Sequence, residues 1–412
     1  MQIIFFENEN ADKLAPITSL RPTFDIHCGG TTLAILSKIL FKYSGARIIV
    51  RSQLKAVTLA KFPNPNPWSD RQIFIDGSLV PDAKVLARVA KLVASDKEFV
   101  VKLKGKIVLA AVNSKAHGIS EKSVRKLTPE NIQEFLTSLK LKVVKQELTQ
   151  IENLWDVIVA NMEIIKNNLP LLAQGMTEYK PGVWVGKKVK IAPDVVFDAS
   201  AGNIIINDGT VVEDKVVLRG PIYIGKKCKI NSFADIKNAV SIGDVCKLGG
   251  EIAESVIQGY SNKQHYGFLG YSYLGEWVNL GGGTSNSDMK NTYGQISMAG
   301  QPTGQQFLGC VLGDHVKTAI GTMIYTGKVV GAGSNLYGAV TKDVPAFTNA
   351  GSQLVKLISV PVDVAIKVGK AGMGRRSVKL SAAMRKLIAV LYNSTVSDRK
   401  QAGVKVGKPE LK

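Results

Sequence analysis

The chain has 412 residues, a length that predicts more than one domain. Hydrophobic residues make up 45% and charged residues 21% of it, proportions that exclude a disordered low-complexity chain. No segment approaches the roughly 18 to 20 apolar residues of a membrane span, and no basic segment precedes an apolar core at the N-terminus, so we expect neither a transmembrane segment nor a signal peptide. Four cysteines without a CxxC spacing predict reduced thiols, no metal site and a cytoplasmic location.

The formal net charge of +20 is unevenly distributed. From Ala365 onward twelve Lys and Arg residues stand against two acidic residues, so a charge of +10 lies in this last segment. A basic field attracts phosphate groups of any kind. No aromatic-interleaved basic motif accompanies it, so the sequence does not indicate a specific nucleic-acid partner.

Residues 1–175 alternate short apolar segments with helical stretches. The apolar segments read IIFF, ARIIV, IFID, EFVV and KIVLAAV. Helices are expected over Thr32–Phe41 and Thr128–Leu141, the second with Thr128 as N-cap and Pro129 in its first turn. Alternating strands and helices predict an α/β layered domain, and an apolar stripe over Thr149–Asn168 predicts a helix that links it to the next domain.

The segment KLAPITSLRPTFDIHCGGTTLAILSKI resembles the start of the sugar-nucleotide pyrophosphorylases. That resemblance implies nucleotide binding by Arg21 and, after a later strand, a metal-binding role for Asp76, which a plain turn also explains. The family's glycine-rich phosphate loop is replaced here by FENENAD, and Thr23 stands where the family has Lys. Two interpretations stay open: a divergent nucleotidyltransferase that uses Mg²⁺, or a scaffold that positions the following domain.

An aliphatic residue recurs every six positions in residues 176–350, often followed by Gly. The longest unbroken run is Val212, Leu218, Ile224, Ile230, Ile236, Ile242 and Leu248. A period of six fits a chain that turns a corner after each flat face, with the aliphatic side chain pointing into a triangular prism. The sequence therefore predicts a left-handed parallel β-helix of hexapeptide repeats. Cys228 and Cys246, 18 residues apart, should stack on adjacent coils as small inward residues.

The six-residue register fails twice, over Ser255–Tyr273 and over Ser285–Gly309. Loops that leave a rigid scaffold often carry function, so we expect chemistry at these breaks. The first break contains His265, and imidazole is the side chain that exchanges protons near neutral pH. A merely solvated histidine is the other interpretation.

The segment YSNKQHYGFLGYSYLGEWVNLGGGT resembles the acetyltransferase half of the bifunctional N-acetylglucosamine-1-phosphate uridylyltransferase/glucosamine-1-phosphate acetyltransferase family. The resemblance implies a homotrimer with acetyl-CoA, the co-substrate, between neighbouring prisms. It implies that His265 is the general base that deprotonates the amine of a sugar phosphate. It also implies substrate contacts from Phe268 and Asn279, and acyl-CoA contacts from Gly282 and Thr318.

Two departures from the family concern the acceptor. Ala253 stands where the family has a phosphate-binding Lys, and Asp288 begins the pair that replaces an Asn-Tyr pair. Lys263, Lys290 and Asn291 are candidates for replacement contacts to the substrate. These differences put the identity of the amino sugar in question rather than the type of reaction.

Residues 351–412 form a basic tail in which Ser381–Asn393 is expected to be helical. We expect this helix to pack against a neighbouring protomer, while binding of CoA phosphates or a membrane surface is the alternative. The sequence thus predicts an acetyl-CoA-dependent N-acetyltransferase for an amino-sugar phosphate or a nucleotide-linked amino sugar. The alternatives are sugar-1-phosphate nucleotidyl transfer by the N-terminal domain, with the prism as trimerisation scaffold, and a non-catalytic assembly scaffold.

Overall fold

A computed structural model describes residues 1–43, 45–64 and 67–411. The chain divides into two compact units. The first comprises residues 1–14, 20–26 and 31–152, and the second comprises residues 15–19, 27–30 and 153–412. In the described part of the chain, no helix is both long enough and apolar enough to cross a membrane.

The first unit is an α/β domain built on a five-stranded sheet, as predicted. Its strand order is β4-β1-β5-β7-β6; β4, β1 and β5 are parallel, β7 is antiparallel to β5, and β6 is antiparallel to β7. The bounds of these strands are β1 Gln2–Phe6, β4 Ala46–Ile49, β5 Arg71–Asp76, β6 Phe99–Leu103 and β7 Lys106–Asn113. The helices of this unit are α1 Leu33–Phe41, α2 Lys55–Lys61, α3 Ala83–Val93, α4 Glu121–Val124 and α5 Ile132–Ser138.

Two of the predicted helices begin later than the sequence indicated. Helix α5 starts at Ile132 because residues 128–131 form a separate turn, in which the Asn131 side chain accepts a hydrogen bond from the Thr128 N–H (2.8 Å). Helix α6 (Asp156–Leu172) starts well after Thr149 because residues 149–151 pair as extended chain with the segment after β5. Helix α1 begins as predicted, with the Thr32 hydroxyl capping the Ile35 N–H.

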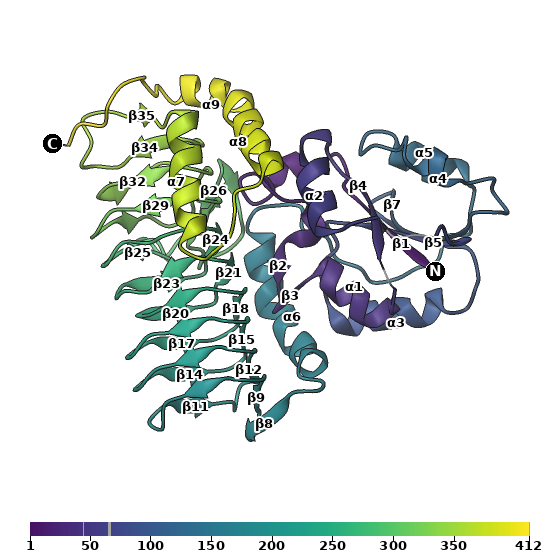
Figure 1. Cartoon of the computed structure of the whole chain (residues 1–412), viewed down its shortest axis with the longest axis horizontal. Coiled ribbons are helices and arrows are strands. Elements are labelled where there is room, and N and C mark those ends of the chain that lie inside the picture. The colour runs from purple at the N-terminus through teal and green to yellow at the C-terminus, as the bar shows by residue number, and fades with distance from the viewer. Residues whose placement is uncertain (44, 65–66, 412) are drawn as a thin grey trace. The chain divides into compact units, whose positions relative to one another are not determined.

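The second unit contains a left-handed parallel β-helix of about nine coils (Figure 1). Most coils contribute one strand to each of three faces; the coil of β24 and β25 reaches face B only through an isolated bridge at Asn279. The strands of face A are β9 Val183–Val185, β12 Ile204–Ile206, β15 Ile222–Ile224, β18 Val240–Ile242, β21 Val256–Gly259, β24 Tyr273–Glu276, β28 Cys310–Leu312 and β31 Lys328–Val330. Those of face B are β10 Lys190–Ile191, β13 Val211–Val212, β16 Lys229–Ile230, β19 Lys247–Leu248, β22 Asn262–Lys263, β29 Lys317–Thr318, β32 Asn335–Leu336 and β34 Thr348–Ala350. Those of face C are β11 Val196–Asp198, β14 Val217–Arg219, β17 Asp235–Lys237, β20 Glu251–Ala253, β23 Phe268–Gly270, β25 Ser285–Asn286, β30 Met323–Ile324 and β33 Ala339–Val340.

The periodic aliphatic residues fill the interior of the prism. Val212, Ile230 and Leu248 lie in register on face B and are almost completely buried in one continuous core. Cys228 and Cys246 precede strands that pair in register, so the prediction that they stack on adjacent coils is confirmed. The six-residue period therefore reflects one inward side chain per face, which removes apolar surface from water along the whole prism.

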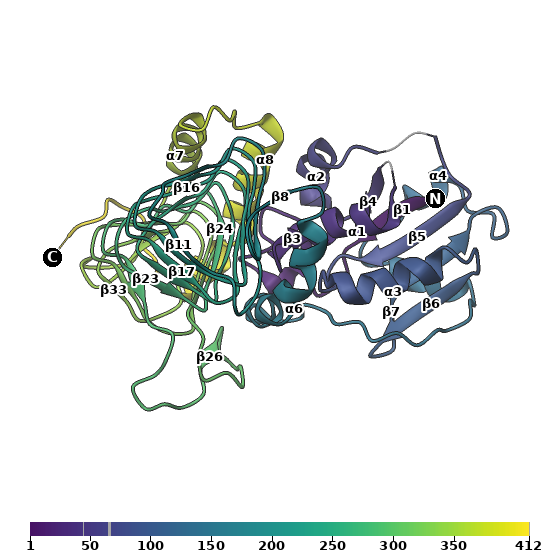
Figure 2. The same cartoon turned by 90° about the horizontal axis from the view of Figure 1, so that it is seen from below.

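The two predicted breaks differ. Residues 255–273 do not leave the prism: they form a full coil through β21, β22 and β23, each paired with the coil before it. The prediction of a loop there is therefore wrong. The six-residue period is lost because a corner of the prism is shorter here and because Lys263, a charged residue, occupies an inward position. The second break is a true excursion between β25 and β28, and it carries the hairpin of β26 (Ser297–Met298) and β27 (Gln301–Pro302) (Figure 2).

Helices and short antiparallel strands flank the prism. Helix α6 packs Ile165 and Leu169 against Ile205 on face A. The C-terminal helices are α7 Val362–Gly374, α8 Ala382–Ser394 and α9 Val396–Gln401, of which only α8 was predicted. They contact the prism of their own chain, for example where Arg399 donates to the Ala346 carbonyl (3.4 Å). Strand β8 (Thr177–Lys180) pairs antiparallel with β9, and β35 (Ile358–Ser359) pairs antiparallel with β34.

Candidate functional site

His265 lies at the corner between faces B and C, in the turn from β22 to β23. Its side chain is exposed and contacts the Gln264 side chain through Nε2 (3.1 Å). The next coil places Gly282 beside it: a Cβ added to Gly282 would lie 3.7 Å from the Cβ of His265. A Cβ on Gly283 would lie 3.0 Å from the Tyr266 hydroxyl. The structure therefore brings His265 and Gly282 together on one exposed edge.

The backbone N–H of Gly282 differs from those of its neighbours. Gly281 donates to the Thr318 hydroxyl (2.8 Å), and Gly283 donates to the Tyr266 carbonyl (3.1 Å). The Gly282 N–H has no hydrogen-bond acceptor among the residues that the structure describes, although its carbonyl accepts from Gly321 (2.8 Å). A donor is thus available to a ligand next to the imidazole.

Lys263 and Thr318 point into the prism. Lys263 pairs in register with Leu248 and is 2% exposed, and its ammonium donates to the carbonyls of Gly249 (2.8 Å) and His265 (2.7 Å). Burial lowers the pKa of Lys263 to about 8. The buried Thr318 hydroxyl bonds that of Thr284 (2.6 Å). Both predicted ligand contacts therefore support the corner from inside, and neither side chain faces the outer surface.

Phe268 and Asp288 lie together on face C. The Phe268 ring covers Gly270, and a Cβ on that glycine would also lie 3.2 Å from Asp288 Oδ2. Burial and the nearby charge of Glu251 raise the pKa of Asp288. Lys290, in the excursion after β25, donates to the Gln295 carbonyl (2.5 Å) and so holds that loop.

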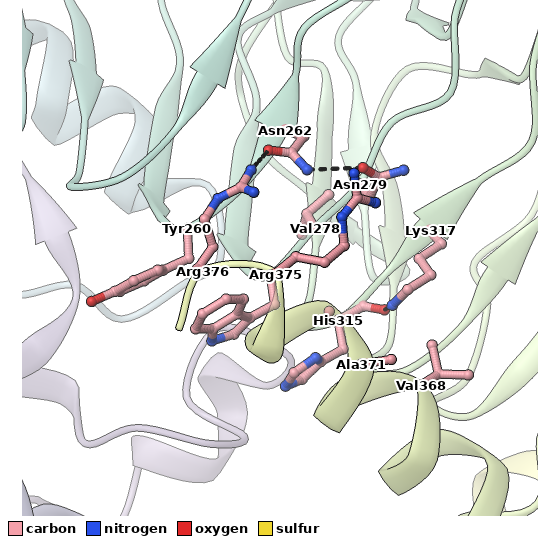
Figure 3. A pocket seen from close by; sticks show the side chains of 12 residues that line it. Tyr260, Asn262, Val278, Asn279, His315, Lys317, Val368, Ala371, Arg375 and Arg376 are labelled. Carbon is pink, nitrogen blue, oxygen red and sulfur yellow. Dashed lines mark hydrogen bonds between the residues drawn. The ribbon is translucent and has the colours of Figure 1, made fainter. Parts of the chain in front are cut away.

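Asn279 lies on face B rather than with Phe268 and Asp288. Its Oδ1 accepts from Asn262 Nδ2 (3.0 Å), and Asn262 Oδ1 accepts from Arg376 (2.7 Å) (Figure 3). These contacts place Asn279 in a pocket of about 330 Å³ between face B and helix α7. The sequence pattern did not indicate this pocket, because no helix was predicted over the residues of α7.

Three stacked rings form one wall of the pocket, at the same corner of three successive coils. Tyr260 stacks on Trp277 with ring centroids 4.4 Å apart, and Trp277 stacks on His315 with centroids 6.4 Å apart. A Cβ on Gly369 of α7 would lie 3.5 Å from the His315 ring, so the helix closes the pocket at this end. The pocket is lined by Tyr260, Asn262, Trp277, Val278, Asn279, His315, Lys317, Val368, Ala371, Gly372, Arg375 and Arg376.

Cations gather at this pocket without counter-ions. Among residues 1–43, 45–64 and 67–411, no carboxylate forms an ion pair with Lys247, Lys317, Arg375 or Arg376. The charge of Arg376 and burial lower the pKa of Lys247. Burial lowers the pKa of Lys317 to about 8. Lys247 lies beside the pocket rather than in its lining, and positive charges without counter-ions form a surface suited to an anion.

In the first unit, Asp76 at the end of β5 is fully engaged by uncharged donors. Its Oδ1 accepts from the N–H (2.9 Å) and hydroxyl (2.7 Å) of Ser78, and its Oδ2 accepts from Asn8 (2.9 Å) and Gln150 (3.3 Å). Burial raises the pKa of Asp76. Hydrogens directed at both oxygens do not fit a Mg²⁺ ligand, and the described residues contain no cluster of three or more His, Cys, Asp or Glu side chains suited to a metal.

The segment that replaces the phosphate loop forms a buried ion pair. Glu7, at the end of β1, accepts from Arg51 Nη2 (2.9 Å) and Nε (3.1 Å). The carbonyl of Arg21 adjoins the same guanidinium (3.5 Å), and Arg21 is 4% exposed. Arg21 and Asp76 are thus both buried, and the carboxylates of Glu7 and Asp76 are engaged by donors of the first unit.

Comparison with known proteins relates the N-terminal part of the chain to a family. Residues 3–177 match the sugar nucleotidyl transferase family. The chain also matches the bifunctional protein GlmU of Synechococcus elongatus, with 26% identity over 187 residues, and that of Idiomarina loihiensis, with 25% identity over 195 residues. The resemblance stated from the sequence is therefore confirmed.

The matched parts are short relative to those proteins. They cover 44% and 42% of this chain but only 37% and 41% of the two relatives, so the chain spans about two fifths of their length. Among solved structures, an Arabidopsis UDP-N-acetylglucosamine acyltransferase matches over 55% of this chain and 96% of its own, at 14% identity and a TM-score of 0.30. A likeness at that score supports no inference about function.

Proposed function

We propose that the β-helix is an acyl-CoA-dependent N-acyltransferase that acts on an amino-sugar phosphate or a nucleotide-linked amino sugar. One observation carries the proposal: the exposed imidazole of His265 lies beside Gly282, whose N–H has no acceptor among the described residues. A base and a backbone donor next to each other are the two groups that acyl transfer requires.

The two groups act on opposite partners of the reaction. His265 takes a proton from the amine as its nitrogen attacks the thioester carbon, and the new C–N bond replaces the C–S bond. The Gly282 N–H stabilises the negative charge that develops on the carbonyl oxygen. The thiolate then leaves and takes up the proton from the imidazolium, which restores the base.

Face C provides a surface for the acceptor. Phe268 offers an apolar ring, and Asp288 with Glu251 concentrates negative charge next to it. An amino sugar arrives as an ammonium ion, which this negative charge attracts; it then loses one proton to solvent, and the free amine is the species that attacks the thioester. The assignment of Phe268 and Asp288 as acceptor contacts, and of acetyl-CoA as the donor, is part of the proposal.

The corner depends on buried polar side chains. Lys263 holds the carbonyl of His265 and Thr318 holds the N–H of Gly281, so we assign both a positioning role. We also propose a homotrimer in the cytoplasm, as the family resemblance implies. Analytical ultracentrifugation of the full chain should give three times the protomer mass of 44.4 kDa.

We propose that the first unit serves as a scaffold. The family match over residues 3–177 favours nucleotidyl transfer, but the internal pairing of Glu7 with Arg51 and the saturated carboxylate of Asp76 favour a structural role. Release of pyrophosphate from a nucleoside triphosphate and a sugar 1-phosphate in the presence of magnesium would refute this assignment.

The central experiment measures acetyl-CoA turnover against a panel of amino-sugar phosphates. His265→Ala should lower kcat by about 10²- to 10⁴-fold, the usual contribution of a general base. His117→Ala is the matched control, because His117 pairs with Glu98 in the first unit (3.1 Å) and should leave turnover unchanged. Equal rates for wild type and His265→Ala would exclude His265 as the base, and no acylation of any amine would exclude the acyltransferase assignment.

A further inference from the structure

Tyr266 directly follows the proposed base, and the proposed reaction gives it no role. Its side chain is 76% exposed, and its hydroxyl has no hydrogen-bond partner in the part of the chain that the structure describes. A phenol hydroxyl in this state is a hydrogen-bond donor that is available to a ligand.

The ring of Tyr266 lies across two glycines of the next coil. A Cβ built on Gly283 would lie 3.0 Å from the hydroxyl oxygen and 3.2 Å from Cζ, and a Cβ built on Gly282 would lie 4.0 Å from Cε1. The ring therefore runs over the bare backbone of both residues, with the hydroxyl at the Gly283 end. Consecutive Cα atoms are about 3.8 Å apart, so the hydroxyl lies roughly one residue from the N–H of Gly282.

The backbone of this turn supplies a single donor to a ligand. The N–H of Gly281 bonds the Thr318 hydroxyl (2.8 Å), and the N–H of Gly283 bonds the Tyr266 carbonyl (3.1 Å). Of these three consecutive glycines, all described by the structure, Gly282 alone keeps its N–H for a ligand. Enzymes that transfer acyl groups commonly direct several donors at the developing oxyanion, so a second donor has to come from a side chain.

Two side chains lie next to Gly282. The three atoms nearest to a Cβ built there are Cβ and Cγ of His265 (3.7 and 3.8 Å) and Cε1 of Tyr266 (4.0 Å). His265 is the base of the proposed reaction, so its ring faces the amine rather than the carbonyl oxygen. On the following coil the Gly321 N–H bonds the Gly282 carbonyl (2.8 Å), and the residue before it, Ile320, has no polar side-chain atom. Tyr266 is therefore the side-chain donor that this corner offers.

We propose that the Tyr266 hydroxyl is the second donor to the oxyanion, beside the Gly282 N–H. The inference rests on the proposed acyl transfer. As the amine attacks, the C=O bond becomes a C–O⁻ single bond, and the hydroxyl donates a hydrogen bond to this oxygen without giving up its proton. When the C–S bond breaks and the C=O bond re-forms, the charge on the oxygen disappears and the hydrogen bond weakens. Such a donor lowers the barrier because it binds the transition state more strongly than the thioester.

Steady-state kinetics of the full chain, with acetyl-CoA and an amine that the wild type acylates, test the inference. Tyr266→Phe removes the hydroxyl and keeps the ring, so kcat should fall by about 10²- to 10³-fold, the usual cost of one oxyanion donor, while KM for acetyl-CoA and the urea midpoint of unfolding stay unchanged. Tyr266→Leu also lacks the hydroxyl and should lose at least as much. Tyr179→Phe is the matched control, because this tyrosine is 47% exposed on β8, the strand that pairs with the first strand of face A.

The outcomes separate this inference from the proposed function. A wild-type kcat for Tyr266→Phe overturns the inference, and so does a raised KM with unchanged kcat, which would make Tyr266 a binding contact only. A loss of kcat that comes with a lower urea midpoint, or a smaller loss in Tyr266→Leu than in Tyr266→Phe, assigns the effect to packing and overturns it as well. If the wild type acylates no amine, both proposals fail; if His265→Ala is impaired and Tyr266→Phe is not, this inference alone fails.

Discussion

Replacement of Lys263 by Met tests whether a charged side chain is buried inside the prism. The ammonium is 2% exposed and donates to two backbone carbonyls, so Met would fill the same space without a charge. Near pH 7 the variant loses two hydrogen bonds but also removes the cost of burying a charge, and these effects oppose each other. The informative quantity is therefore how the stability difference changes with pH.

The magnitude follows from the pKa. Burial lowers the pKa of Lys263 from 10.5 to about 8, so the unfolded chain binds the proton more tightly than the folded chain. Between these values the unfolded state carries more protons, and wild-type stability rises with pH. This gain in the stability of the wild type is lost again as the pH falls from 10.5 to about 8. Relative to Lys263→Met, wild type should gain about 2 to 3 kcal/mol between pH 7 and pH 10.

Urea unfolding of both proteins, followed by circular dichroism at fixed protein concentration, measures this difference at several pH values. The comparison cancels the titration of all shared groups, including Lys317. A stability difference that stays constant within about 0.5 kcal/mol from pH 7 to pH 10 would refute the buried ammonium. A slope of the opposite sign would show that the ammonium is more basic in the folded chain than in the unfolded one.

Three further predictions concern stability and use the same unfolding assay. Gly281→Ala should lower the free energy of unfolding by about 1 to 3 kcal/mol, because its Cβ would lie 2.7 Å from the Ala319 carbonyl carbon. Gly282→Ala, with its nearest contact at 3.7 Å, should change that free energy by less than about 1 kcal/mol. Equal effects of the two substitutions would contradict the corner geometry. Arg51→Met should lower the free energy of unfolding by about 3 to 5 kcal/mol, because it leaves the carboxylate of Glu7 buried without its guanidinium partner. An unchanged free energy of unfolding would show that Glu7 reaches solvent. Asn168→Ala should cost about 1 to 3 kcal/mol, because the buried amide bonds the Gly29 carbonyl (2.8 Å); no loss would exclude that bond as a stabilising contact.

The sequence predicted the prism because one inward aliphatic residue per face leaves a clear period of six. The same rule failed over residues 255–273, where the inward series continues as Ile257, Lys263 and Leu269. Leu248 and Ile252 are only four residues apart, so a shortened corner shifted the register just before a lysine took an aliphatic position. A sequence period is recognised only when both the residue type and the spacing repeat. Here the spacing was shortened and an aliphatic residue was replaced by Lys263.

The candidate site was predicted in part. Proximity of His265 to Gly282 follows from their places at the same corner of successive coils, a relation that spacing can express. The ring wall was missed although Tyr260 and Trp277 are separated by 17 residues, about one coil. The third ring, His315, lies one coil further but 38 residues on, because the excursion after β25 intervenes. An insertion between two coils changes the sequence spacing of residues that stack on each other, so the stack becomes visible only in the structure.

The two antiparallel strands at the ends of the prism have a consequence for assembly. A parallel β-helix ends in open strand edges at both ends, and each edge could template another prism into a fibre. Strands β8 and β35 run opposite to the strands they cover and are only four and two residues long. On the one face that each strand covers, it leaves too short and too misdirected an edge for a further coil to continue, so one face at each end of the prism is blocked against end-to-end polymerisation.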